Sequence, residues 1–257
     1  EMRQSEGWFG RRVNMDSLLL QGNGQITVSD TTGVVLYRHS FSTLFQEWQS
    51  TEEATRVSKS FENVFLVPMP KQTVDVTVTL FDTHRQVRSS LKHRVNPQDI
   101  LIRPVQEGHK WEYLRRSGDS REKIDVAFVA EGYRQDEMDV FRRDCEESIG
   151  AMLSHEPFRS MADRFNFVAV YSPSTDSGVS IPHQGVWKRT AADSHFDTFY
   201  SQRYLTTLHL KRLHDLLSGI PYEHIVILAN TDNYGGGGIF NSYLLSAAHH
   251  PSCKPVV

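Results

Sequence analysis

Residues 123–133, which read KIDVAFVAEGY, decide the fold of the second half of the chain. The run Ile124–Ala130 is apolar except for Asp125, and Gly132 follows it almost at once. A continuous apolar run of this length, ended by glycine, is typical of a strand buried on both faces. The sequence therefore predicts a buried strand that leaves the sheet through a glycine turn.

Helices and strands alternate downstream of this strand. An apolar stripe at three- and four-residue steps predicts a helix from about Asp136 to a point before Pro157. Leucines between 205 and 217 predict a second helix, closed by Gly219 and Pro221. Further buried strands are predicted at Phe165–Tyr171 and Ile225–Ala229. This order indicates an α/β layer.

The first part of the chain is predicted to consist of strands. Val74, Val76 and Val78 alternate with polar residues, the pattern of a strand buried on one face. Two β-rich runs flank a turn signal at 30–33 and predict a hairpin. We therefore expect an α+β protein of two domains: an antiparallel β-sandwich over residues 1–114 and an α/β domain over residues 123–257, with the polar stretch 115–122 between them.

The composition excludes several classes of function. The 257 residues are 39% hydrophobic and 23% charged, and the formal net charge is -3. Because lysine and arginine are scattered, no basic surface for nucleic acid or an anionic membrane is expected. No apolar run reaches the roughly 18 residues of a membrane-spanning helix. Cys145 is predicted to be a buried free thiol, and a disulfide to Cys253 is the alternative.

Two patterns suggest metal binding without completing a site. His155 and Glu156 begin the zinc-peptidase pattern H-E-x-x-H, but an arginine takes the place of the second histidine. Asp193, His195 and Asp197 alternate in a long loop, residues 172–200, and would share a cation only if that segment were extended. We therefore expect this chain to contribute no metal ligand.

Serine chemistry is a weaker alternative. Ser174, Ser177 and Ser180 share the long loop with His183 and Asp176, which are the residue types of a catalytic triad. A G-x-S-x-G turn, which would expose a serine nucleophile, is missing from the sequence.

Four successive glycines, Gly235–Gly238, follow the last predicted strand. No Gly-Lys-Ser/Thr comes after them, so they do not form a phosphate loop. One interpretation is a flexible turn. The other is an edge segment whose missing side chains let a substrate backbone approach and pair with it.

Five segments occur in a fixed order along the second half of the chain: KIDVAFVAEGY at 123–133, FNFVAV at 165–170, SGVSIP at 177–182, NTDNYGG at 230–236 and AAHH at 247–250. This ordered set resembles the IgA-peptidase family of zinc metallopeptidases. The predicted sandwich resembles the N-terminal domain that accompanies the catalytic domain in bacterial members.

The resemblance implies a zincin-like catalytic domain whose upstream lobe lies at 123–257. In the family, the stretch matching 255–257 runs into a helix with His-Glu-x-x-His, which holds zinc and the general base. Residues 1–257 alone are therefore expected to bind no zinc and to be inactive, whereas the full-length protein is expected to hydrolyse peptide bonds.

The resemblance also implies a substrate and a location. The strand before the metal helix pairs with extended protein or peptide substrate, and here that role falls on Gly235, Gly236, Gly237, Gly238, Ile239 and Phe240. Location outside the cytoplasm, secreted, periplasmic or at the cell surface, is implied as well. A non-catalytic module that binds a peptide or glycan is the alternative function.

Overall fold

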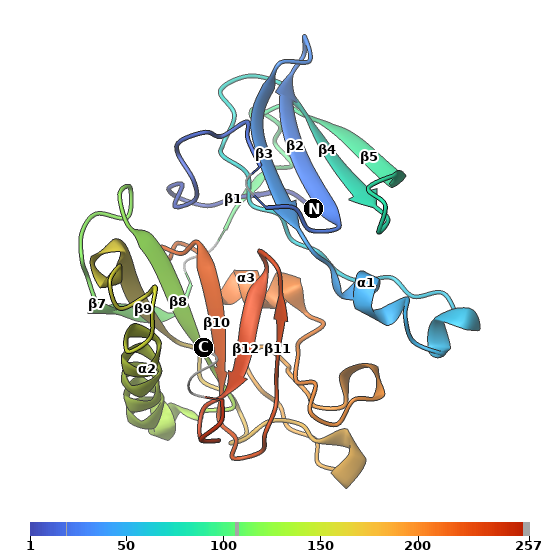
Figure 1. Ribbon diagram of the computed structural model, residues 1–257. Coiled ribbons are helices and arrows are strands. Elements are labelled where there is room, and N and C mark those ends of the chain that lie inside the picture. Colours follow the sequence, from blue (N-terminus) through green and yellow to red (C-terminus); the bar gives the residue numbers. More distant parts are fainter. Residues whose placement is uncertain (19, 106–107, 254–257) are drawn as a thin grey trace. The chain divides into compact units, whose positions relative to one another are not determined.

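The computed structural model describes residues 1–18, 20–105 and 108–253 (Figure 1). The chain divides into two compact units. The first comprises residues 1–106 with the turn Ile239–Ser242, and the second comprises residues 107–238 and 243–257. No helix among the described residues is long and apolar enough to cross a membrane.

The first unit contains one four-stranded antiparallel sheet in the order β3-β2-β4-β5. The predicted hairpin is confirmed, because the Asp30 carboxylate accepts hydrogen bonds from the Thr32 and Val34 backbone N–H groups and closes the turn. The strands are β2 (Gly24–Asp30), β3 (Val35–Phe41), β4 (Val74–Phe81) and β5 (Val87–Val95); the shorter elements are β1 (Arg3–Gln4), β6 (Arg103–Pro104), α1 (Leu44–Trp48) and η1 (Glu53–Thr55).

Loops, and not a second sheet of comparable size, cover the core of this unit. Ile26, Tyr37 and Val74 are buried on one face, where Trp8 and Phe65 from irregular segments pack against them. Besides the four-stranded sheet, the described part of this unit has only the two-residue pair β1–β6. The antiparallel sheet was predicted correctly, whereas the two-layered sandwich is not seen.

The second unit is built on a six-stranded sheet in the order β11-β12-β10-β8-β9-β7. The four inner strands are parallel, β7 runs antiparallel to β9, and β11 joins β12 through a tight turn. The strands are β7 (Lys110–Arg115), β8 (Ile124–Glu131), β9 (Phe165–Tyr171), β10 (His224–Ala229), β11 (Gly236–Ile239) and β12 (Tyr243–Ala247).

Both faces of this sheet are covered, as the uninterrupted apolar strands predict. Phe128, Phe167 and Val226 pack with Phe141 and Cys145 of α2 (Met138–Leu153) on one face. The alternate residues, such as Val129 and Ile227, are also buried. Figure 1 shows α3 (Leu210–Leu216) behind β10 and β12. Single 3-10 turns, η2 (Gln135–Glu137), η3 (Ala162–Arg164), η4 (Pro182–Gln184) and η5 (Thr198–Tyr200), complete the unit.

Two expected boundaries differ from the structure. Residues 110–114, placed at the end of the expected first domain, form β7 together with Arg115, and this strand pairs with β9. The polar stretch after β7 is held within the second unit, because Asn166 Oδ1 accepts from the Ser117 and Gly118 backbone N–H groups. The second helix is also shorter than predicted, since Leu205 lies in an extended segment.

Candidate functional site

Polar side chains gather where the parallel strands β8, β10 and β12 end. Glu131 ends β8, Asn230 follows β10 and His249 follows β12 closely. The parallel pairings of β10 with β8 and β12 place these positions at one edge of the sheet. Open α/β sheets bind ligands at this edge, so it is the first place to look for a site.

Glu131 anchors the long loop from this edge. Its carboxylate is fully buried and accepts four hydrogen bonds. Oε1 accepts from Thr190 Oγ1 at 2.5 Å, Ser194 N at 2.8 Å and Ser194 Oγ at 2.6 Å, and Oε2 accepts from Ala192 N at 2.6 Å. An ionised carboxylate only accepts and can serve all four donors. Glu131 therefore fixes residues 190–194 to the central strand.

A second buried cluster joins α2 to the segment after β12. Asp144 Oδ2 accepts a hydrogen bond from the Tyr133 hydroxyl at 2.7 Å and lies 2.9 Å from His249 Nε2. Burial, together with the charge of Asp144 and its hydrogen bond, raises the pKa of Tyr133 far above its usual value. The phenol therefore stays protonated and acts as a donor. This cluster positions the chain segment that leaves β12.

The glycine segment lies at the edge of the sheet, but part of its outer side is already paired. Gly236 N donates to Arg203 O at 3.2 Å, and Leu205 N donates to Gly236 O at 3.4 Å. Backbone groups of alternate residues face the same side of a strand, so Gly238 also faces outward. Within the described residues, no hydrogen bond joins Gly238 to a segment outside the β11–β12 hairpin. Gly238 is thus the position of β11 open to an extended ligand.

Gly235 and Gly237 are required by the chain's own packing. A Cβ on Gly237 would lie 2.5 Å from Tyr204 Cε2 and 2.9 Å from Leu205 O, and a Cβ on Gly235 would lie 2.3 Å from Phe196 Cε1. None of the four has a positive φ. The close approach inferred from the sequence exists, but at these two positions the neighbour is residues 196 and 203–206 rather than a substrate.

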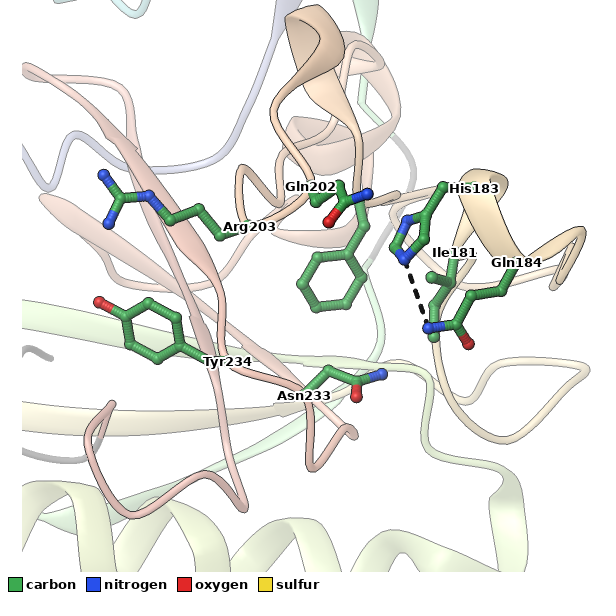
Figure 2. Close-up of a pocket in the computed structure, with 8 residues that line it drawn as sticks. Ile181, His183, Gln184, Gln202, Arg203, Asn233 and Tyr234 are labelled. Carbon is green, nitrogen blue, oxygen red and sulfur yellow. Dashed lines mark hydrogen bonds between the residues drawn. The ribbon is translucent and has the colours of Figure 1, made fainter.

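A pocket of about 240 Å³ lies beside β11. Figure 2 shows Arg203 and Tyr234 on one side of it and His183, Ile181 and Gln184 on the other. We call it the edge pocket; it is lined by Ile181, His183, Gln184, Phe196, Gln202, Arg203, Asn233 and Tyr234.

Asp197 orients His183 at this pocket. The Asp197 carboxylate accepts from His183 N at 2.8 Å and lies 2.8 Å and 2.9 Å from His183 Nδ1. Burial acts to raise the pKa of Asp197, but the hydrogen bonds and charge of His183 outweigh it and leave the pKa below its usual value. Asp197 is therefore ionised at neutral pH and holds the imidazole in one orientation.

The alternative metal site in the long loop is not formed. Asp193 lies 3.4 Å from His209 Nε2, His195 Nδ1 lies 2.7 Å from Phe196 O, and Asp197 bonds His183. No group of three or more histidine, cysteine, aspartate or glutamate residues in the described part of the chain is placed to hold a metal ion.

The serine triad is not formed either. Ser174 Oγ accepts from the Gly132 and Ala191 backbones, and Ser177 Oγ donates to Glu137. Ser180 bonds the Lys188 backbone, whereas His183 faces Asp197.

Both cysteines, Cys145 and Cys253, are buried and free, so the disulfide alternative is not seen.

Family comparisons match both parts of the chain. A family model described as the N-terminus of peptidase M64 matches residues 1–92, and one described as IgA peptidase M64 matches residues 113–252. The chain belongs to the IgA peptidase M64 family. No curated protein matches it.

The M64 match covers the sheet, the long loop and the edge pocket, but the described residues do not fit a zinc ion. His249 and His250 are the histidines nearest the end of this region, and His249 is engaged by Asp144. The pocket residues were not predicted, because they come from three separated segments, 181–184, 196–203 and 233–234. The only sequence signal for them was the unusual length of the loop.

Replacing Gly237 by valine is expected to destabilise the second unit of this M64 protein by about 1–3 kcal/mol, the usual cost of overpacking. The new side chain would meet the Tyr204 ring and the Leu205 carbonyl. Urea unfolding measures the change. Gly238→Ala is the control, because its Cβ would come no closer than 3.3 Å to Leu244 Cδ1 and 4.0 Å to Tyr243 O. Equal unfolding midpoints for the two variants would contradict the packing argument.

Proposed function

We propose that the full-length protein is a zinc-dependent peptidase whose substrate pairs with β11 in extended form. The observation that supports this is the place of the glycine segment: it forms the edge strand of the sheet within the region that matches the M64 family. An edge strand presents unpaired N–H and C=O groups that a peptide can use. We further propose a zincin-like catalytic domain and a location outside the cytoplasm, both on the family resemblance.

In this proposal, β11 supplies the substrate edge and the metal centre lies outside the described residues. Gly238 is exposed and directs its backbone outward, so its N–H and C=O would bond one residue of the peptide. The edge pocket, beside Gly235 and Gly236, would take a side chain of that peptide. The zinc ligands are proposed to lie in the helix that follows the residues matching 255–257 in this family, outside the described residues.

Replacing Gly238 by proline tests the pairing. Proline removes the outward N–H, and an edge strand tolerates it where that N–H faces solvent. Losing one hydrogen bond to the peptide is expected to lower kcat/KM about five-fold. Gly238→Ala keeps the N–H and is the control. If both variants cleave peptides as the unchanged enzyme does, with unchanged melting temperatures, substrate does not pair at Gly238.

Zinc content tests the metal assignment. After dialysis, full-length protein is expected to retain one zinc per chain, and residues 1–257 alone none. A chelator should abolish peptide cleavage by the full-length protein, and added zinc should restore it. Stoichiometric zinc on residues 1–257 would overturn the proposed position of the ligands. Full-length protein that binds peptide but neither takes up zinc nor cleaves the peptide when zinc is added would favour the non-catalytic module.

A further inference from the structure

The edge pocket is rich in hydrogen-bond donors and has no acidic residue in its lining. Arg203 contributes a permanent positive charge, and Gln184, Gln202 and Asn233 contribute amide groups. Within the described residues, the Arg203 side chain takes part in no hydrogen bond or ion pair, and it is solvent-exposed. Its guanidinium group is therefore free to bind an anion.

The backbone around Arg203 is held in place before any ligand arrives. Arg203 O accepts from Gly236 N, which fixes the Arg203 main chain beside β11. Asp197, Phe199 and Tyr200 adopt left-handed conformations, with φ of 62°, 51° and 67°. Residues other than glycine rarely adopt this conformation, and they cluster at ligand-binding sites where they do. The loop is thus strained into the shape that brings Gln202 and Arg203 to the pocket.

The opposite side and the base of the pocket are equally constrained. Asp197 holds His183 through both the backbone and the ring. Phe196 is 2% exposed, and it fits against Gly235 only because that residue has no Cβ. An apolar base with donors around it suits the short aliphatic stem and charged end of an acidic group.

We propose that the edge pocket binds a carboxylate of the substrate peptide, with Arg203 as its charge partner, so that the enzyme prefers acidic peptides. The proposal rests on the proposed peptidase function and assigns the pocket a specificity role. One guanidinium group pairs with a carboxylate through two parallel hydrogen bonds. The carboxylate can belong to an Asp or Glu side chain or to the C-terminus of the peptide, and the same contacts would recognise both.

Peptide binding and cleavage by full-length protein test the proposal. The peptides are fluorescent and differ only by Glu or Gln at one position, and each is made with a free and with an amidated C-terminus. Their affinities are measured by titration against chelator-treated protein. The kcat/KM for each peptide is measured with the zinc-loaded enzyme. The peptide carrying the recognised carboxylate is expected to bind about tenfold more tightly than its neutral partner, as for one charge-assisted contact. The preference should fall as salt is added.

Substitutions identify the residue responsible. Arg203→Gln is expected to abolish the preference, and Arg203→Lys to keep part of it, while the melting temperature stays unchanged. Arg189→Gln is the matched control, because Arg189 also lies between β9 and α3, has a side chain that is 80% exposed and does not line the pocket. Equal affinity of the unchanged protein for acidic and neutral peptides, or an equal loss in Arg189→Gln, would overturn the proposal.

The peptide arms separate the two sources of the carboxylate. Loss of the preference on amidation assigns the pocket to the C-terminus, and loss on Glu→Gln assigns it to a side chain; both outcomes support the proposal. Cleavage without a preference for acidic peptides overturns the pocket assignment but is consistent with the proposed peptidase function. The remaining outcome is an Arg203-dependent preference for acidic peptides in binding, with no cleavage by the zinc-loaded protein. It supports the pocket assignment and overturns the proposed peptidase function.

Discussion

Replacing Glu131 by glutamine is expected to lower the free energy of unfolding by about 3 kcal/mol, the cost of leaving buried donors of a charged acceptor unsatisfied. The glutamine carbonyl would replace only one of the two carboxylate oxygens. Its amide group would then oppose a donor such as Ala192 N, which lies 2.6 Å from Oε2. Urea unfolding at neutral pH measures the loss.

Hydrogen exchange shows where that loss arises. The amides of Ala192 and Ser194, both bonded to the Glu131 carboxylate, should exchange faster in Glu131→Gln. Glu146→Gln is the control, because Glu146 is 48% exposed and its ion pair with Arg142 contributes about 1 kcal/mol or less. If Glu131→Gln and Glu146→Gln unfold at the same urea concentration, Glu131 does not anchor the loop.

The free energy of unfolding is also expected to decrease between pH 6.5 and pH 4, by up to about 3 kcal/mol, through His214. Burial lowers the pKa of His214 to about 4, and its Nδ1 lies 2.8 Å from the Tyr222 hydroxyl. Above pH 6.5, neither the folded nor the unfolded state protonates this histidine. As the pH falls from 6.5 towards 4, His214 is protonated in the unfolded state but stays neutral in the folded state, so the free energy of unfolding decreases.

Urea unfolding across this pH range, with two substitutions, isolates the effect. His214→Gln cannot titrate and is expected to flatten the decrease, at some cost in stability at neutral pH. His155→Gln is the control, because His155 is exposed. An unchanged pH dependence in His214→Gln would show that another group causes the decrease.

Local patterns were enough to predict three of the four inner strands, β8, β9 and β10, and the longer helix, but not β12. Asp125 apart, the run Ile124–Ala130 is apolar, and the stripe of α2 has helical spacing, so burial follows directly from the sequence. The pattern wrongly predicted a helix at Leu205, which has a leucine neighbour at helical spacing. The Leu205 backbone N–H donates to the Gly236 carbonyl instead. Tertiary pairing overrode local preference there. The same limit applies to β7, whose partner β9 is distant in sequence.

The candidate site was predicted only in part. The sequence indicated a glycine segment at an edge, and β11 is an edge strand. The Tyr204 ring, which leaves no room for a side chain at Gly237, was not predicted, because it comes from a loop with no periodic pattern. Substrate binding by this segment remains a prediction. The edge pocket needs three segments to meet, which no local spacing reveals.

Two of the attachments between the sheet and the segment that joins β9 to α3 are made by Glu131, at residues 190–194, and by Gly236, at residues 203–205. Between them, the backbone N–H groups of Tyr200 and Ser201 bond only to Asp197 and Thr198, and the Tyr200 side chain is 74% exposed. Insertions at such a tip are tolerated because they leave the core untouched. Changes in length at residues 200–202 would therefore reshape one wall of the edge pocket while the sheet stays the same. If the edge pocket has its proposed role, a change of length at this tip would alter substrate preference without a compensating change in the core.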